Sequence, residues 1–247
     1  IKFHIPIELI GSNVVVPGHL ETDTVAHCGT SLSGEFVNTL TMTDLATGWT
    51  ENRATWTKHH EKVLAQIKDI ERSIPFFLIG IAVDNGVEFI NHALLDYCNN
   101  RNVKPIKLVR RRPYKKNDAA HVEQKNFTHV RQLFGYDRLD DVHFVRIMNE
   151  IFRAYWNPLW NYFNPNFKLI KKTRIGGKVK KVYDLPKTPY QRILESEHVP
   201  AKVKQRLKDH YKCLNPFMLR KELNKKLKQF NQLVDINNKV MKNVVGF

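Results

Sequence analysis

Three acidic residues in the first half of the chain have the type and the settings of metal ligands. Asp23 lies within LETDTVAHC, Asp84 follows the apolar run FFLIGIAV, and Glu123 falls in AHVEQKN at the start of a helical pattern. Magnesium and manganese prefer oxygen ligands, and two such ions about 4 Å apart can activate the attacking oxygen and stabilise the leaving oxygen of a phosphodiester. The three carboxylates therefore predict a site that holds two Mg²⁺ or Mn²⁺ ions and acts on nucleic acid.

Each acid also has a simpler interpretation. Asp84 opens an Asp-Asn-Gly turn, where aspartate is common for local reasons. Glu123 could be a solvated acid stabilised by the positive end of a helix dipole. Glu21 competes with Asp23 for the role of first ligand, because alternate residues of a strand lie on one face. In the turn after Asp84, we expect Gly86 to accommodate a positive φ that directs the carboxylate toward a cleft.

The elements that must position these acids follow an α/β pattern. Alternating and continuous apolar runs predict strands, and apolar residues at helical spacing predict helices. The predicted strands are 20–27, 35–44, 49–55, 76–83 and 103–108, and the predicted helices are 58–73, 91–100, 119–134 and 141–156. This order predicts a mixed five-stranded sheet flanked by helices.

Three segments carry a family resemblance. DTVAHCG, VDNGVEF and KKNDAAHVEQKN resemble the catalytic core of bacterial insertion-sequence transposases with a retroviral-integrase-type core, over about residues 20–165. The resemblance implies a ribonuclease-H-like fold and a metal-binding catalytic triad of Asp23, Asp84 and Glu123. The number of residues between Asp84 and Glu123 is close to the family's spacing. Val83 stands where many relatives have Ser or Thr, and Ala82 and Ala119 stand where polar residues are common, but none of these departures removes a ligand.

The charge of the chain indicates its partner. The net charge is +16, from 40 Lys and Arg against 24 Asp and Glu, and nearly all of the excess lies after residue 140. A charge distributed so unevenly favours a polyanion, most often nucleic acid, over a merely solvated surface. No apolar run is long enough for a membrane helix. The three cysteines show neither zinc spacing nor a disulfide framework, which fits a reducing compartment and a cytoplasmic, nucleoid location.

We expect contacts with double-stranded DNA in three places. They are a basic loop before the catalytic helix, the residues that follow Glu123 on that helix, and a basic hairpin turning at Gly176–Gly177. A hairpin whose lysines only protect its edges against aggregation is the alternative for the third. The predicted contacts are Arg110, Arg111, Arg112, Lys115 and Lys116 in the loop, Gln124, Lys125 and Asn126 on the helix, and Lys171, Lys172, Arg174, Lys178, Lys180 and Lys181 in the hairpin.

The predicted organisation is a linker over 1–19, a catalytic core over 20–165, and a basic hairpin with a helical tail over 166–247. We also expect the chain to be a fragment of a longer protein, since it lacks an initiating Met. The sequence predicts a transposase fragment that cleaves a DNA strand and uses the freed 3′-hydroxyl to attack target DNA. The resemblance implies a homo-oligomer on DNA, because two element ends must be held together. A nuclease that only hydrolyses and a catalytically silent DNA-binding module are the alternatives.

Overall fold

A mixed five-stranded sheet forms the centre of the protein. The computed structural model describes residues 1–8, 14–102, 104–112 and 120–245. The strands lie in the order β3-β2-β1-β4-β5, with β1 antiparallel to β2 and parallel to β4. Their bounds are β1 His19–Ala26, β2 Val37–Asp44, β3 Thr50–Trp56, β4 Gly80–Val83 and β5 Lys107–Arg110. Flanked by helices, this sheet confirms the predicted ribonuclease-H-like fold class.

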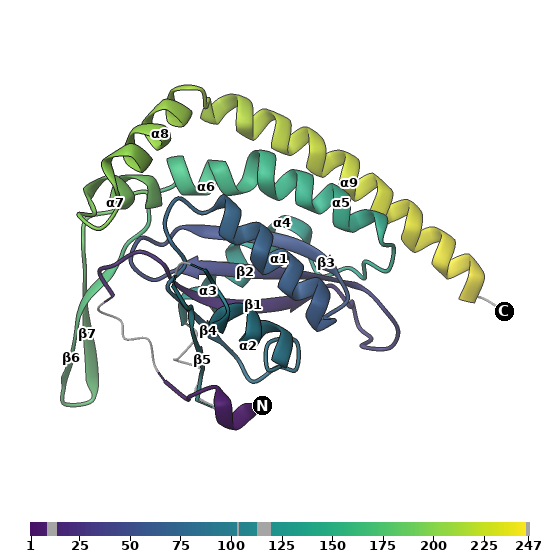
Figure 1. Ribbon diagram of the computed structural model, residues 1–247. Helices are drawn as coiled ribbons and strands as arrows, with labels where there is room; N and C mark the ends of the chain where they lie inside the picture. The colour runs from purple at the N-terminus through teal and green to yellow at the C-terminus, as the bar shows by residue number, and fades with distance from the viewer. Residues whose placement is uncertain (9–13, 103, 113–119, 246–247) are drawn as a thin grey trace.

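Helices pack on both faces of the sheet (Figure 1). Helix α1, His60–Ser73, buries Val63, Ile67 and Ile70 in the same apolar cluster as Leu20 of β1. The next strand residue, Glu21, instead contacts helix α3, Ala120–Lys125, because successive side chains of a strand point to opposite faces. Helix α2, His92–Asn99, connects β4 to β5 and allows these strands to run parallel.

Two predicted elements differ from the structure. The apolar run 76–83 is a strand only from Gly80, because the N–H groups of Ile79 and Gly80 both bond to the Gly18 carbonyl at the start of β4. The predicted helix 119–134 is α3, a π-helical segment Asn126–Arg131 and the short α4, Gln132–Phe134. Because a π turn holds an extra residue, it changes which side chains face the sheet, and such turns are frequent at functional sites.

A long helix lies along the edge of the sheet at β3. It consists of α5, His143–Ile151, a π-helical segment Phe152–Trp156, and α6, Asn157–Phe163. The predicted helix 141–156 ends before the Asn157-Pro158 pair. The helix continues instead, because Pro158 lies in the first turn of α6, where a missing N–H costs little.

Three asparagines of this helix satisfy the free edge of β3. The Asn149 side chain accepts from the Ala54 N–H at 2.8 Å and donates to the Ala54 carbonyl at 2.9 Å. Asn161 makes the same pair of bonds with Thr50, both at 2.9 Å, and Asn157 lies between them and donates to Glu51. The amides thus take the place of a sixth strand.

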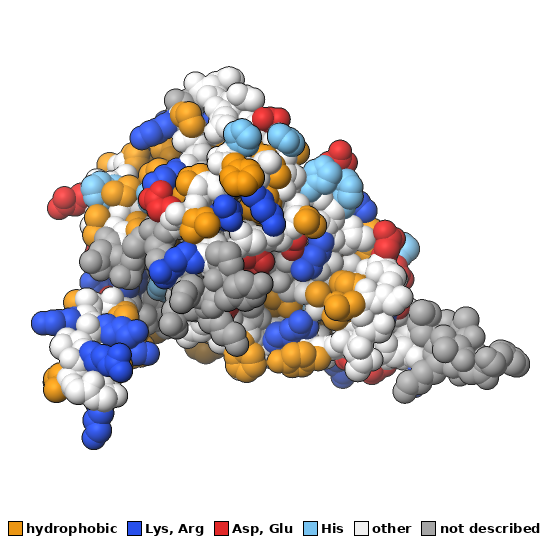
Figure 2. Space-filling view, turned by 90° about the horizontal axis from the view of Figure 1, so that it is seen from below, with side chains coloured by type: hydrophobic (Ala, Val, Ile, Leu, Met, Phe, Trp, Pro, Cys, Tyr) orange, Lys and Arg blue, Asp and Glu red, His pale blue; other side chains and the backbone are white. Residues whose placement is uncertain are grey.

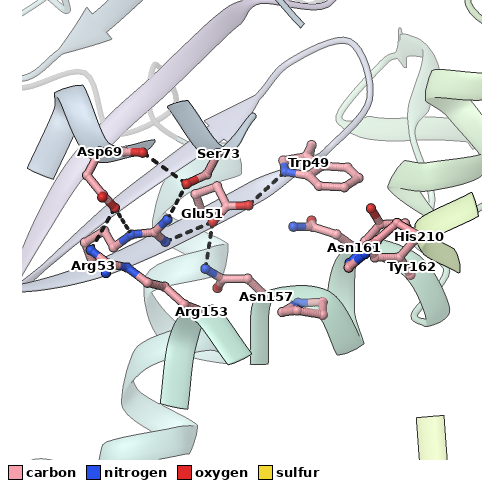
Figure 3. Close-up of a pocket in the computed structure, with 11 residues that line it drawn as sticks. Trp49, Glu51, Arg53, Asp69, Ser73, Arg153, Asn157, Asn161, Tyr162 and His210 are labelled. Atoms are coloured by element: carbon pink, nitrogen blue, oxygen red, sulfur yellow. Dashed lines mark hydrogen bonds and ion pairs between the residues drawn. The ribbon is translucent and has the colours of Figure 1, made fainter. Parts of the chain in front are cut away.

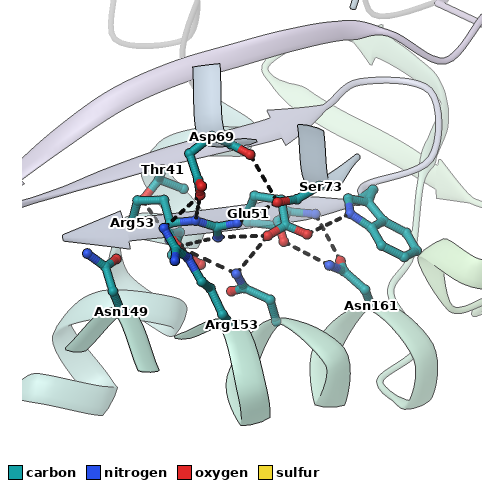
Figure 4. Close-up of polar contacts among 12 residues, drawn as sticks. Thr41, Glu51, Arg53, Asp69, Ser73, Asn149, Arg153 and Asn161 are labelled. Atoms are coloured by element: carbon teal, nitrogen blue, oxygen red, sulfur yellow. Dashed lines mark hydrogen bonds and ion pairs between the residues drawn. The ribbon is translucent and has the colours of Figure 1, made fainter. Parts of the chain in front are cut away.

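The π-helical segment explains why these asparagines align. Eight residues separate Asn149 from Asn157, and in an ideal α-helix they would differ by about 80° around the axis. The wider turn at Phe152–Trp156 accommodates an additional residue and reduces this difference. A buried network continues inward from the edge, where Arg53 contacts Glu51, Asp69 and Ser73 (Figure 4).

The tail packs on the core. Helices α7, Pro189–Glu195, and α8, Ala201–Lys212, bury Ile193 and Leu207 in the cluster that contains the sheet. Helix α9, Pro216–Val245, lies beside α5 and α6, with Phe230 against Phe134 and Phe144 (Figure 1). In the part of the chain that the structure describes, no helix is both long and apolar enough to cross a membrane.

The predicted basic hairpin is present and projects away from the core (Figure 1). Its strands are β6, Leu169–Ile175, and β7, Lys178–Tyr183, joined through Gly176 at a φ of 59°. That left-handed conformation explains the glycine at the turn.

Candidate active site and nucleic-acid interface

Asp23 and Asp84 come from neighbouring parallel strands. Glu21 on β1 pairs with Ala82 on β4, so Asp23 and Asp84, each two residues further on, lie at the same level. Burial raises the pKa of Asp23 to about 6, the Arg111 charge opposes this rise, and the Asp84 charge adds to it. Two carboxylates that repel each other beside the end of β4 form a setting that a cation would stabilise.

The structure separates the roles of Glu21 and Asp23. Glu21 is only 5% exposed, and its carboxylate accepts from the Val122 N–H and contacts His121 Nδ1, both at 3.1 Å. This hydrogen bond raises the pKa of His121 above its ordinary value, against the effect of burial. Glu21 is thus engaged at the start of α3. Asp23 accepts from the Thr24 N–H at 2.9 Å and from Asn126 Nδ2 at 2.8 Å, which leaves carboxylate lone pairs available.

Glu123 lies on the helix that crosses these acids but does not reach them. It is exposed on α3, and within the described residues it makes no hydrogen bond or ion pair. Asn126, three residues further on, contacts Asp23, and residues three apart lie on the same side of a helix. Among the described residues, no group of three or more Asp, Glu, His or Cys side chains lies close enough to hold a metal ion.

The turn after Asp84 brings Gly86 close to two carboxylates. The Gly86 N–H donates to Asp84 Oδ1 at 2.9 Å. Gly86 has no positive φ, so the predicted reason for this glycine is wrong. A Cβ there would lie 2.4 Å from Glu88 Oε2 and 3.0 Å from Asp84 Oδ1, so a side chain at this position would displace the Glu88 carboxylate. Glu88 itself is buried, accepts from Thr24 Oγ1 at 3.0 Å and pairs with Lys58 at 3.3 Å.

Arg110 and Arg111 of the predicted basic loop bond to groups within the protein. Arg111 is 6% exposed and donates to the Thr22 carbonyl at 2.6 Å, which places its charge beside Asp23. Arg110 donates to the Ile5 carbonyl at 2.9 Å and to Asn85 Oδ1 at 3.2 Å. Arg112 is exposed. The predicted contacts Lys115 and Lys116 lie outside the described residues.

The three predicted contacts on the catalytic helix have different surroundings. Gln124 is exposed, whereas Asn126 bonds to Asp23. The Lys125 ammonium lies 5.5 Å from the centre of the Trp160 ring, and burial lowers its pKa to about 8. Gln124 and Lys125 also line a cleft of about 510 Å³ between α3, the β2–β3 turn and the base of the hairpin.

All six predicted hairpin cations are exposed, and they occupy both faces of the ribbon. The strand register places one set on each face, because opposite residues share a face and neighbours alternate. Lys172, Arg174 and Lys181 lie on one face, and Lys171, Lys178 and Lys180 lie on the other. Figure 2 shows Lys and Arg side chains gathered on this projecting arm at the left of the molecule.

A second polar cleft lies between β3, α1 and α6 and has a volume of about 270 Å³ (Figure 3). Its charged groups bond to one another. Arg53 pairs with Glu51 at 2.9 Å and with Asp69 at 2.6 Å, and Asp69 also pairs with Arg153 at 2.9 Å. No sequence motif predicts this network, because its members come from distant segments of the chain. Because these charged groups pair with one another, we interpret the network as a structural support for the edge of the sheet at β3.

Comparison with known proteins gives one curated relative and several structural neighbours. No protein-family model matches the sequence. The chain is 39% identical over 196 residues to the uncharacterized protein y4rM of Sinorhizobium fredii, a match that covers 78% of this chain and 54% of the relative. The chain therefore spans about half the length of the curated relative that it matches.

The structural neighbours include retroviral integrases. The simian T-cell lymphotropic virus intasome, solved with the PP2A regulatory subunit B56 gamma, is similar at a TM-score of 0.46 and 13% identity, over 80% of this chain and 58% of that one. The catalytic core of BIV integrase gives 0.42 and 17%, over 73% and 96%. The HTLV-2 integrase core, solved with magnesium, gives 0.43 and 19%, over 62% and 92%. Because these TM-scores are low, the fold assignment rests on the strand order and pairing.

Proposed function

We propose that this chain is the catalytic part of a DNA transposase that cleaves a DNA strand at an element end and joins the freed 3′-hydroxyl to target DNA. The observation that carries this proposal is the meeting of Asp23 and Asp84 at the same level of two neighbouring parallel strands, below the helix that bears Glu123. The basic arm supports DNA as the substrate. The resemblance of DTVAHCG, VDNGVEF and KKNDAAHVEQKN to transposase cores supports the reaction type.

Asp23, Asp84 and Glu123 would hold two Mg²⁺ or Mn²⁺ ions. The donor set fits such ions, because it consists of carboxylate oxygens and two of the acids already repel each other. When bound, the ions would activate the attacking oxygen and stabilise the leaving oxygen. The protein holds Asp23 in place through Asn126 and the Thr24 N–H, and balances its charge with Arg111.

The surrounding residues would place the DNA. The hairpin cations would hold backbone phosphates on either side of the arm, while Gln124 and Arg112 would contact the strand beside the acids. Buried Arg111 would act through Asp23. Since transposition brings two element ends together, we propose a homo-oligomer on double-stranded DNA, acting at the bacterial nucleoid.

A strand-transfer assay with Mg²⁺ and the full-length protein's own element ends tests this function. Asp84→Asn and Glu123→Gln should abolish joining and leave DNA affinity within about twofold, because each removes a ligand charge from a surface that contacts DNA elsewhere. Glu21→Gln is the matched control and should retain joining, because Glu21 is engaged with α3. Joining by Asp84→Asn would exclude the proposed triad.

A catalytically silent DNA-binding module is the second candidate. The separation of Glu123 from the two aspartates favours it. The same assay distinguishes the candidates: a wild-type protein that binds DNA but neither cuts nor joins it is the silent module, and one that cuts without joining is a nuclease.

A further inference from the structure

The cleft between α3, the β2–β3 turn and the base of the hairpin combines cations with exposed aromatic rings. Its wall includes Trp160, Phe167 and Tyr183, together with Gln124, Lys125 and Lys168. Phe167 is 65% exposed and Tyr183 is 49% exposed, and their ring centres lie 6.2 Å apart with the planes at 67°. Exposed aromatic rings beside cations are the usual elements of single-strand nucleic-acid sites, where bases stack on the rings.

The charged side chains of the cleft differ in how many hydrogen-bond partners they have. Asp44, the acid of the wall, accepts from the Gly18 N–H and from both the N–H and the hydroxyl of Thr47 at 2.7–2.8 Å. Lys168 is held by the carbonyls of Val14 and Ala46. Lys125, in contrast, makes no ion pair among the described residues, and its half-buried ammonium lies beside the Trp160 ring. A half-buried cation of this kind favours an anionic ligand.

The position and size of the cleft define that ligand further. The cleft includes His121 and Gln124, which flank Glu123 on α3, and His121 contacts Glu21 two residues before Asp23. Its volume of about 510 Å³ lies within the range of roughly 300–1,000 Å³ that is typical of small-ligand sites. A base within a duplex has both faces covered by its neighbours and cannot stack on a protein ring unless it is unpaired.

We propose that this cleft receives one unpaired nucleotide of the DNA strand beside the cleaved phosphodiester, with its base against Phe167 and Tyr183 and its phosphate at Lys125. The inference rests on the proposed function, since it assumes DNA at the neighbouring acids. Phe167 and Tyr183 lie together at the base of the hairpin, so the arm and the cleft would hold one continuous path of DNA.

Binding of two probes to the full chain tests this site. One probe is a short blunt duplex, and the other is the same duplex with an unpaired tail of a few nucleotides that carries a fluorescent aminopurine base. The wild-type protein should bind the tailed probe about tenfold more tightly, and aminopurine fluorescence should fall as the base stacks. Phe167→Ala and Tyr183→Ala should each lose most of the preference and of the quenching, without a change in affinity for the blunt duplex.

The matched control is Phe217→Ala, which removes an 83% exposed ring on α9, away from the cleft. It should keep the tail preference, and circular dichroism should show all three variants folded. Equal wild-type binding of both probes, or a preference that survives Phe167→Ala and Tyr183→Ala, would overturn the nucleotide site and leave the proposed function standing. Binding of neither probe would refute both.

Discussion

Asp23 and Glu21 show how neighbouring groups give two like residues different roles. Both project from the same face of β1 toward the same helix. Glu21 accepts from the Val122 N–H in the first turn of α3, where a carboxylate is stabilised by the helix terminus. Asp23, one residue pair further along, meets a single amide of Asn126 and the charge of Asp84. Strand alternation places Glu21 and Asp23 on the same face of β1. The helix that packs on this face gives them different surroundings, because it begins above Glu21 and passes over Asp23.

A third acid, Asp44, should give the folded protein a pH-dependent stability. Burial raises the pKa of Asp44 to about 6, although hydrogen bonds from Gly18 and Thr47 oppose this rise. The folded state then binds the proton more tightly than the unfolded state, so the stabilisation is complete below a pH of about 3.8 and is lost as the pH rises through about 6. The free energy of unfolding should fall by at most about 3 kcal/mol over this interval.

Urea unfolding at several pH values measures this contribution. Asp44→Asn should flatten the decline of the unfolding free energy with pH, and an exposed acid such as Glu61→Gln on α1 should leave it unchanged. A decline of equal slope in Asp44→Asn and the wild type would assign the effect to other groups.

At the scale of elements, the asparagine contacts on β3 predict a large effect for small substitutions. Asn161→Ala would leave the N–H and carbonyl of Thr50 without partners in a buried setting, at a cost of about 1–3 kcal/mol in unfolding free energy. Asn149→Ala should do the same at Ala54. The double variant should also associate, because it uncovers a strand edge.

Chemical denaturation and light scattering measure these two effects. Asn224→Ala, at an exposed position on α9, is the control and should change neither. A double variant as stable and as monodisperse as this control would show that water satisfies the edge equally well.

The hairpin makes a separate prediction about salt. Lys172→Gln with Lys181→Gln removes two positive charges that are paired across the strands on one face of the arm. If both contact phosphates, the slope of log affinity against log salt should become shallower by roughly 2. The control is Lys62→Gln with Lys225→Gln, at exposed positions on α1 and α9, which should leave the slope unchanged. Equal slopes for both double variants would exclude this face of the arm from the interface.

For the whole molecule, the packing predicts one cooperative unit that includes the tail. Phe230 of α9 is 1% exposed, within 5.0 Å of the Phe134 ring centre and 5.4 Å of that of Phe144. Phe230→Ala should cost about 3–5 kcal/mol and lower the temperature of a single unfolding transition. Calorimetry distinguishes this result from a loss of α9 alone, which would appear as a second, earlier transition. Phe217→Ala, with its exposed ring, should leave the transition in place.

Much of this architecture could be predicted because it depends on local patterns. The strands, α1 and the hairpin follow from apolar periodicity and glycine turns, and the meeting of Asp23 with Asp84 follows from the order of strands. The π-helical segments, the Asn149 and Asn161 contacts and the Arg53 network could not be predicted. They depend on which surface of one element faces another, and an asparagine on a helix has the same local pattern whether it meets solvent or a strand edge.

The asparagine contacts also form late during synthesis of the chain. β3 is complete at Trp56, but its amide partners follow 95 and 111 residues after the backbone groups that they satisfy. At synthesis rates of about 5–20 residues per second, the edge of β3 remains open for about 5–20 s before its partners have even been made. During that interval the uncovered edge of β3 can pair with another extended chain.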